Sequence, residues 1–403
     1  MTRRRWSSAG ERWMMIVSAA EIQGWTSIGF APLRDALTEA AANEPGLQAQ
    51  LAVYHRGRPV ADLWTGGLMT GDTLLALFST GKGAAFLVLA LLVQDGVIEL
   101  DRPVAEYWPE FAVAGKDRIT VRQLAAHQAG LIGVPGGFTV DELSDDRRLA
   151  ERLAGQEPWW APGTAHGYHA FVIGALVGEL VRRTTGQTLQ EVFDARIRRP
   201  HDLDFHLGLP VAEEPRFLEA APLTAAERGA TPRPPADSLT AIAFNLHAPE
   251  PTDLVAFGND PVVHRRGPAS SGSIGTARGV ARMYAAATTG IDGGRPLLAP
   301  ETIEEFTRPH GSGVDLVTGE AGHFLLGFEA QASRYPSLSP RAFGHSGAVG
   351  AQSFADPETG IAYSYARRRF ALGGGGGAAE NRGLVSAVTR LAEVVDSPAH
   401  AVR

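Results

Sequence analysis

The chain has 403 residues, of which 44% are hydrophobic and 20% charged, a balance that excludes wholesale disorder, a collagen-like repeat and a coiled-coil rod. Its formal charge of −7 and its lack of a long basic run argue against nucleic acid or an anionic membrane as a partner. The chain contains no cysteine, which excludes disulfides, thiolate metal sites, iron–sulfur clusters and a cysteine nucleophile.

The N-terminal residues 1–20 are predicted to form a disordered leader. Three arginines followed by the apolar residues 13–20 resemble an export signal. However, Glu11 and Arg12 lie between the arginines and the apolar residues, and the apolar part is short. We therefore predict a cytoplasmic protein, with export as the alternative. No apolar stretch reaches the roughly 18 residues that a membrane span needs; the longest, residues 84–93, is predicted to be a buried helix.

The first third of the chain predicts a hairpin followed by a central helix. Two β-type runs within residues 48–66 flank Arg56-Gly57-Arg58, which is typical of a hairpin turn. Residues 73–97 carry apolar side chains on nearly every face of a helix, which predicts a helix at the centre of the molecule. A short amphipathic helix is expected over residues 119–126.

The middle of the chain is predicted to be mainly helical. Helical patterns cover residues 141–154, 170–185 and 189–199. The proline-rich passage 210–268 shows little periodicity, and because it is too long for a simple connection we expect it to cover a site.

Regular structure is expected to resume in the last third of the chain. The pattern predicts helices at 276–289 and 380–395, strands at 323–331, 341–345, 351–355 and 361–366, a turn at 356–360 and a mobile glycine loop at 373–377. Strands at both chain ends predict a split α/β domain of the α+β type. This domain comprises residues 21–130 and 267–403, and residues 131–266 form a helical insertion lobe.

The most informative short segment is Ser79-Thr80-Gly81-Lys82, predicted at the start of the central helix. A serine hydroxyl is a poor nucleophile until a base removes its proton, and side chains three residues apart on a helix lie on one face. Burial would lower the pKa of Lys82, so that part of it is a neutral base. Lys82 and Lys116 are the only lysines, so a chance pairing of this kind is rare. The alternative is an N-cap serine with an unrelated lysine.

Several blocks of the sequence together resemble the serine β-lactamase and penicillin-binding-protein superfamily. They are residues 78–82, 96–104, 119–131, 162–170 and 344–348. The likeness is greatest to the class C-like carboxylesterases with a β-lactamase fold, the family VIII esterases, and it runs from about residue 25 to 395. It implies a central antiparallel sheet flanked by helices, with a helical insertion lobe.

Carried over residue by residue, the resemblance implies an acyl-transfer site. Ser79 is the acylated nucleophile, Lys82 is the general base or holds the proton network, and Tyr168 is the proton shuttle. His345, Ser346 and Gly347 stand in place of the family's Lys-Thr-Gly strand motif, and the oxyanion hole is formed by the backbone N–H groups of Ser79 and Ala348. His127 and His169 are expected to lie in the wall of the site.

Two departures from the family pattern favour esters over β-lactams. Ala170 replaces the asparagine of the Tyr-x-Asn motif, and His345 replaces the lysine of Lys-Thr-Gly. A methyl group and a neutral imidazole cannot hold an amide side chain and a carboxylate as the family's residues do. The expected function is therefore a serine carboxylesterase that forms an acyl-enzyme on short-chain or small-molecule esters, with no metal and no cofactor.

Alternative functions stay open beside this one. An acyltransferase, a D-aminopeptidase or other amide hydrolase and a weak β-lactamase share the fold, and a non-catalytic binding protein is the alternative from another class. A Ser-His-Asp hydrolase is discounted because no serine has glycine at both −2 and +2. The segment 201–206 holds His and Asp side chains that could bind a metal, but it is better explained as a structural turn.

Overall fold

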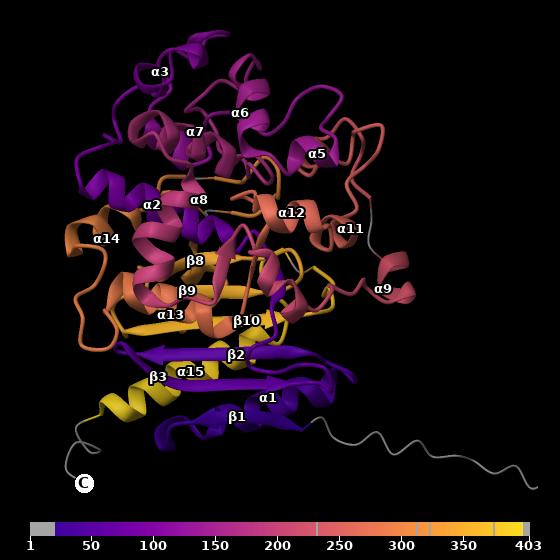
Figure 1. The fold of residues 1–403 in the computed structure, drawn as a ribbon, viewed down its shortest axis with the longest axis vertical. Helices are drawn as coiled ribbons and strands as arrows, with labels where there is room; N and C mark the ends of the chain where they lie inside the picture. The colour runs from indigo at the N-terminus through magenta and orange to yellow at the C-terminus, as the bar shows by residue number, and fades with distance from the viewer. Residues whose placement is uncertain (1–20, 231–232, 312, 322–323, 374, 398–403) are drawn as a thin grey trace, which may run out of the picture.

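The computed structural model of the protein describes residues 21–230, 233–311, 313–321, 324–373 and 375–397. The predicted leader, residues 1–20, lies outside the described residues. A seven-stranded sheet crosses the lower half of the molecule in Figure 1, and all of its neighbouring strands are antiparallel. Its strands in spatial order are β1 (Ile22–Thr26), β3 (Arg58–Thr65), β2 (Ala49–His55), β10 (Ile361–Arg367), β9 (Gln352–Asp356), β8 (Phe343–Ser346) and β7 (Glu329–Ala330).

Each face of this sheet is covered by helices because side chains alternate along its buried strands. In β2, Leu51 and Val53 pack in one apolar cluster, whereas Ala52 and Tyr54 pack in another. The first cluster includes α1 (Pro32–Asn43) and α15 (Asn381–Asp396), and the second includes α2 (Gly81–Gln94) and α13 (Ala277–Thr288). The predicted antiparallel sheet flanked by helices is therefore confirmed.

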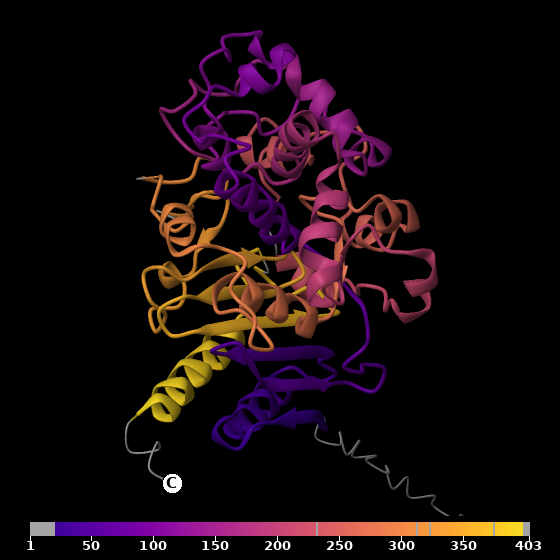
Figure 2. The ribbon, with the colours of Figure 1, turned by 60° about the vertical axis from the view of Figure 1, so that its left-hand side comes forward.

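The helix α2 lies near the middle of the molecule, between the large sheet and the helices of the upper half (Figures 1 and 2). Its residues from Gly81 to Leu92 are all buried, as the all-round apolar pattern predicts. The surrounding helices are α3 (Val104–Tyr107), α4 (Val121–Ala125), α5 (Val140–Leu143), α6 (Asp146–Ala154), α7 (Ile173–Thr185), α8 (Leu189–Phe193) and α14 (Pro300–Phe306). None of the helices in the described ranges has the length and apolar character that a membrane crossing needs.

The structure corrects the predicted start of the central helix. Residues Leu75–Phe78 form a strand, β4, and the helix begins at Gly81 instead of residue 73. β4 pairs with β6 (Ser273–Gly275), which also pairs with β5 (Phe205–Leu207), in a small three-stranded sheet. A short apolar run fits a strand or a helix equally well, and its partner, β6, lies about two hundred residues away.

One further prediction for the middle of the chain is wrong. The helix expected over residues 141–154 is two helices, α5 and α6, because the Asp145 carboxylate accepts from the backbone N–H groups of Arg147 and Arg148 and starts a new helix there. The described residues of the proline-rich passage form four short α-helices, each too short to show periodicity: α9 (Ala225–Ala230), α10 (Leu239–Ala243), α11 (Leu254–Gly258) and α12 (Pro261–Arg266).

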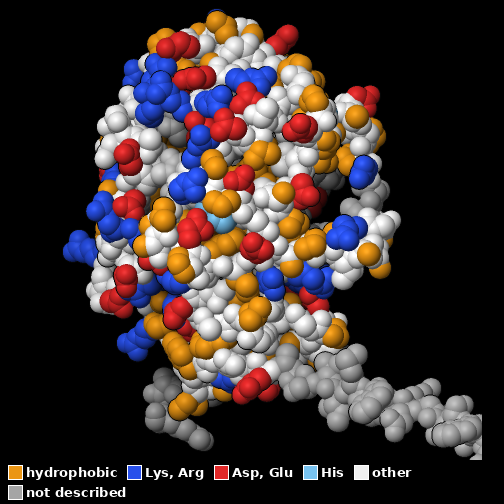
Figure 3. All heavy atoms as spheres, turned by 45° about the vertical axis from the view of Figure 1, so that its right-hand side comes forward, with side chains coloured by type: hydrophobic (Ala, Val, Ile, Leu, Met, Phe, Trp, Pro, Cys, Tyr) orange, Lys and Arg blue, Asp and Glu red, His pale blue; other side chains and the backbone are white. Residues whose placement is uncertain are grey.

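Acidic and basic side chains are interspersed over the face shown in Figure 3. A mixed surface of this kind offers no extended basic track for a nucleic-acid backbone.

Candidate active site

Ser79 lies in the sharp turn between β4 and α2, not on the helix itself. The residue before it, Phe78, has a φ of +49°, a left-handed conformation that a bulky side chain adopts only when its surroundings hold it. The Phe78 ring packs edge-to-face on Phe370 at a centroid distance of 5.3 Å, and the Ser273 hydroxyl donates to the Phe78 carbonyl oxygen at 2.8 Å. This strained turn aims Ser79 into a cavity of about 310 Å³.

Lys82 is fully buried one turn further on, with its amine against Ser79. The Nζ atom lies 3.1 Å from Ser79 Oγ, 2.6 Å from the carbonyl oxygen of Ala170 and 2.7 Å from that of Ser270. A neutral amine has two N–H donors for the two carbonyls and one lone pair for the serine proton, whereas an ammonium ion donates to all three atoms. Both charge states of Lys82 are therefore fully hydrogen-bonded.

Burial lowers the pKa of Lys82 well below its ordinary value, and the charges of Glu329 and Asp146 oppose this only in part. A buried amine with a lowered pKa is neutral more readily than an exposed lysine. Lys82 consequently meets the requirement for a base that takes the Ser79 proton.

Tyr168 is the second side chain that contacts the Ser79 hydroxyl. Its hydroxyl donates to Ser79 Oγ at 2.9 Å, and Lys82 Nζ lies 4.9 Å from the centre of its ring. The ring stacks on Phe324, and the Tyr168 backbone N–H donates to Asp315 Oδ1 at 3.2 Å. Burial raises the pKa of the Tyr168 phenol above its ordinary value, so the group is a neutral donor.

The end of β8 lies close to the turn that carries Ser79. A Cβ on Gly347 would stand 2.4 Å from the carbonyl oxygen of Leu77, so only glycine allows this approach. The next residue, Ala348, lines the cavity with Ser79. In the described part of the chain, neither the Ser79 nor the Ala348 N–H donates to another backbone group. Free N–H groups at a cavity wall are what an oxyanion hole requires.

Ser346 lines the cavity and is bound to a carboxylate that the sequence analysis missed. Its hydroxyl donates to Glu329 Oε1 at 2.8 Å, and its backbone N–H donates to Glu329 Oε2 at 3.1 Å. Arg334 donates to the same carboxylate at 2.7 Å. The signal in the sequence is a single charged residue inside the apolar run 324–330, an arrangement that is costly unless the charge is paired.

The three histidines expected near the site are all fully buried, and none of them lines the cavity. His127 accepts from the backbone N–H of His169 through Nδ1 at 3.1 Å, and its ring lies 5.7 Å from that of Tyr168. His169 donates from Nδ1 to the Gly167 carbonyl oxygen at 2.7 Å and accepts from the Leu131 N–H through Nε2. These contacts leave both rings neutral, behind the wall that Tyr168 forms.

His345 is also neutral. Burial lowers its pKa to about 4, although the Glu329 carboxylate opposes the shift. Burial likewise lowers the pKa of His169 to about 4 and that of His127 well below its ordinary value. None of the three imidazoles supplies a fixed positive charge at neutral pH.

The cavity has one apolar side and one polar side. Phe244, Val317 and Phe324 form the apolar side, and two of the polar residues, Glu320 and Arg334, are joined by an ion pair at 2.6 Å. The full lining is Ser79, Tyr168, Thr240, Phe244, Val317, Thr318, Glu320, Phe324, Glu329, Arg334, Ser346, Ala348 and Gly375. Thr240 and Phe244 belong to the proline-rich passage that was expected to cover a site.

The segment considered as a metal site, residues 201–206, is occupied by protein contacts. Asp204 binds the Arg216 guanidinium, and His201 bonds through Nδ1 to the Ile197 carbonyl oxygen at 2.9 Å. The described residues contain no group of three or more His, Asp or Glu side chains placed to hold a metal ion.

Comparison with known proteins gives consistent matches over most of the chain. The beta-lactamase family model matches residues 33–385. An esterase/beta-lactamase of Mycobacterium tuberculosis (strain ATCC 25618 / H37Rv), LipL, is 34% identical over 340 residues, which cover 79% of this chain and 76% of LipL.

Two solved structures agree with these matches. EstA from Arthrobacter nitroguajacolicus Rue61a is 39% identical with a TM-score of 0.87, and the alignment covers 93% of this chain and all of EstA. A family VIII carboxylesterase is 31% identical with a TM-score of 0.83, covering 92% of this chain and all of the other. The family model spans most of the chain, and relatives more than 30% identical align with most of its length. The chain therefore belongs to the beta-lactamase family and is a serine hydrolase.

Proposed function

We propose that the chain is a carboxylesterase that cleaves small-molecule esters through a covalent acyl-enzyme on Ser79. The observation that carries the proposal is the series of contacts from Tyr168 Oη through Ser79 Oγ to Lys82 Nζ at the wall of a cavity. The names of LipL, an esterase/beta-lactamase, and of the family VIII carboxylesterase support an ester as the substrate.

In the proposed first half-reaction, neutral Lys82 takes the Ser79 proton as Oγ attacks the ester carbonyl carbon. The carbonyl oxygen gains negative charge and accepts from the N–H groups of Ser79 and Ala348. The C–O bond then breaks, and the alkoxide takes a proton from the Tyr168 hydroxyl, which recovers one from the Lys82 ammonium. The alcohol leaves, and the acyl group stays on Ser79.

In the second half-reaction, water attacks the acyl-enzyme, and its proton passes by way of Tyr168 to Lys82. The carboxylic acid leaves, Ser79 Oγ regains its proton, and the net reaction is an ester and water giving an acid and an alcohol. The raised pKa of Tyr168 favours this relay role, because its phenolate is too costly to persist as a resting base.

The surroundings of Ser79 favour esters over β-lactams. His345 is neutral and buried behind the cavity wall, and Ala170 offers only a methyl group, so neither supplies the polar partner of a β-lactam. An ester needs fewer partners, and its alkoxide departs more readily than an amine. We also propose that residues 131–266, which contribute Thr240 and Phe244 to the cavity, select the substrate.

Labelling with a fluorophosphonate and mass spectrometry tests the mechanism. A single adduct on Ser79 is expected in the unaltered protein and none in folded Ser79→Ala, whose ester turnover should fall by several orders of magnitude. A folded Ser79→Ala protein with near-normal turnover would exclude the acyl-enzyme on Ser79.

A substrate comparison tests the choice of ester. We expect p-nitrophenyl acetate and butyrate to exceed nitrocefin by at least about 100-fold in kcat/KM, since a polar substrate without its binding partners is disfavoured to about this degree. The opposite ranking would replace the esterase proposal with a β-lactamase.

A further inference from the structure

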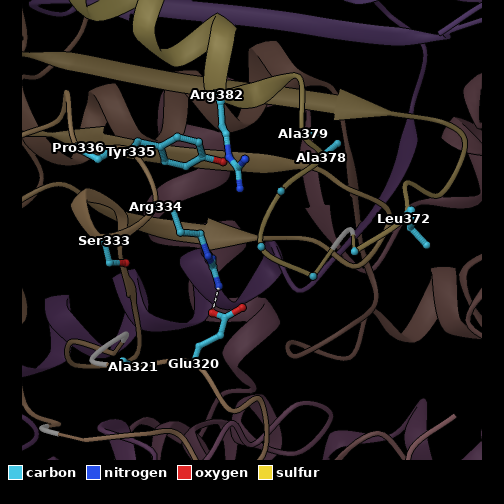
Figure 4. A pocket seen from close by; sticks show the side chains of 14 residues that line it. Glu320, Ala321, Ser333, Arg334, Tyr335, Pro336, Leu372, Ala378, Ala379 and Arg382 are labelled. Atoms are coloured by element: carbon cyan, nitrogen blue, oxygen red, sulfur yellow. Dashed lines mark hydrogen bonds and ion pairs between the residues drawn. The ribbon is translucent and has the colours of Figure 1, made fainter. Parts of the chain in front are cut away.

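A second cavity adjoins the one that Ser79 lines. It has a volume of about 820 Å³ and shares Glu320, Arg334 and Gly375 with the first, but Ser79 and Tyr168 are not part of its wall. We call it the antechamber. Its lining is Glu320, Ala321, Ser333, Arg334, Tyr335, Pro336, Leu372, Gly373, Gly375, Gly376, Gly377, Ala378, Ala379 and Arg382 (Figure 4).

Arg334 lines both cavities, and its charge is already neutralised. Its guanidinium donates to Glu320 at 2.6 Å and to Glu329 at 2.7 Å. A Cβ on Gly376 would stand only 3.1 to 3.3 Å from the guanidinium, so the loop backbone packs directly against it. Two carboxylates around one cation therefore hold Arg334 in place.

Arg382 supplies the positive charge of the antechamber. It projects from the first turn of α15 into the space beside Tyr335, on the opposite side from Glu320 (Figure 4). Its side chain is exposed, and across the described ranges no carboxylate lies within ion-pair distance of it, whereas Arg334 has two. A guanidinium without a protein partner is a ready donor for a planar anion.

The glycine loop on one side leaves the antechamber open. Gly376 and Gly377 have φ values of +134° and +87°, which side chains rarely adopt. A Cβ on Gly377 would stand 2.8 Å from the Tyr335 hydroxyl oxygen. Because this stretch of wall consists of backbone only, the space beneath Arg382 stays free for a ligand.

We propose that the antechamber binds a carboxylate carried by the substrate at a distance from the ester bond, with Arg382 as its counter-ion. This inference rests on the proposed esterase function and names the class of ester. One unpaired guanidinium matches one negative charge, and the Glu320 carboxylate opposes a dianion such as a phosphate monoester.

Matched pairs of esters test the proposal. One pair is p-nitrophenyl octanoate and p-nitrophenyl hydrogen suberate, with the carboxylate on the acyl chain. The other is hexyl butyrate and its analogue with a terminal carboxylate on the hexyl chain. For the acidic ester whose carboxylate enters the antechamber, Arg382→Gln should raise KM about five- to tenfold and leave kcat within twofold. The reason is that an ion pair remote from the ester bond stabilises the bound substrate and the transition state equally. Arg382→Glu should raise KM further.

Arg390→Gln is the matched control, since Arg390 lies exposed on the same helix, outside the antechamber. It should leave every KM unchanged, and Arg382→Gln should leave the neutral esters and nitrocefin unchanged. High salt should shrink the difference between acidic and neutral esters. The proposal would be overturned if Arg382→Gln raised KM equally for neutral and acidic esters, or raised it for neither acidic ester.

The neutral esters separate this inference from the proposed function. If the folded, unaltered protein hydrolyses no neutral ester, the esterase proposal fails by itself. Binding of the acidic esters to Ser79→Ala, measured by calorimetry with and without Arg382→Gln, then still tests the antechamber. A fivefold or greater loss of affinity supports the anion site, and equal affinities reject it.

Discussion

The hydrogen bonds of Lys82 link its charge state to the reaction. Its two carbonyl partners and the Ser79 hydroxyl satisfy the amine whether it is neutral or protonated, so accepting a proton breaks no hydrogen bond. Burial, opposed in part by the charges of Glu329 and Asp146, then decides how readily the proton is lost. This arrangement explains why a lysine stands here in a chain whose other basic residues, apart from Lys116, are arginines.

The pH profile should report Lys82. Because the base must be neutral, kcat/KM for a neutral ester should rise with pH through the lowered pKa of Lys82 and reach a plateau well below pH 10. His345 and His169 have pKa values of about 4 and are neutral from pH 6 upward. The rise of kcat/KM with pH in that range therefore does not come from these two histidines.

The measurement is kcat/KM against pH for p-nitrophenyl butyrate, corrected for spontaneous hydrolysis. Lys82→Ala should lose several orders of magnitude in rate together with this rise. If folded Lys82→Ala kept the same rise of kcat/KM with pH, the base would have to be another group.

Tyr168→Phe tests the proposed role of the Tyr168 hydroxyl in proton transfer. Removing one hydroxyl keeps the stacking on Phe324 but deletes the donor to Ser79, so the fold should persist and the rate should fall by roughly 10²–10⁴. Steady-state kinetics with circular dichroism as the folding control measures both effects. A loss under tenfold would make Tyr168 a wall residue only.

At the scale of elements, the site depends on the meeting of the β4–α2 turn with the end of β8. The turn supplies Ser79 and β8 leads into Ala348, and Gly347 permits their close approach. Glu329 on the neighbouring strand β7 holds both polar groups of Ser346 and so fixes the end of β8.

Gly347→Ala should therefore separate the two donors of the proposed oxyanion hole, the N–H groups of Ser79 and Ala348. The added methyl group would stand 2.4 Å from the Leu77 carbonyl oxygen, and backbone must move to relieve this contact. We expect kcat to fall about 10²-fold or more, the usual cost of one misplaced donor, with a smaller change in KM.

Steady-state kinetics and thermal unfolding of the same variant measure the effect. The matched control is Gly383→Ala in α15, where a Cβ meets nothing within 4 Å and should leave kcat unchanged. Equal activity of both folded variants would show that the approach of β8 to the turn does not matter for catalysis.

At the scale of the whole molecule, the cavity joins segments that are far apart in the chain. Ser79 follows β4, Phe244 belongs to the proline-rich passage, and Arg334 and Gly375 come from the last third. The cavity wall is therefore built from segments that no single stretch of sequence contains.

Phe244→Ala should widen the apolar side of the cavity. The ring lies 6.1 Å from that of Tyr168 and lines the cavity, so its loss should shift the preferred acyl chain toward longer esters by about tenfold in relative kcat/KM. A series of p-nitrophenyl esters measures this. Leu246→Ala, an exposed residue two positions along that lies outside the cavity, should leave the preference unchanged.

Local pattern was sufficient for several features of this protein. The β2–β3 hairpin follows from runs of β-type residues around a turn, the central helix from apolar residues on every face, and the closing helix from a 3.6-residue period. All three patterns are properties of residues close together in the sequence. The spacing of Ser79 and Lys82 with the matching blocks around it was enough to predict an acyl-transfer site, because both side chains come from one short segment.

Tertiary structure alone decided the rest. β4 is a strand because β6 pairs with it, Lys82 is held by carbonyls 88 and 188 residues away, and Arg334 is paired by two acidic residues from different segments. The buried placement of the three histidines and the antechamber beside Arg382 likewise depend on which segments pack together. Contacts between residues distant in sequence leave no periodicity or spacing in the chain, and so only the folded molecule reveals them.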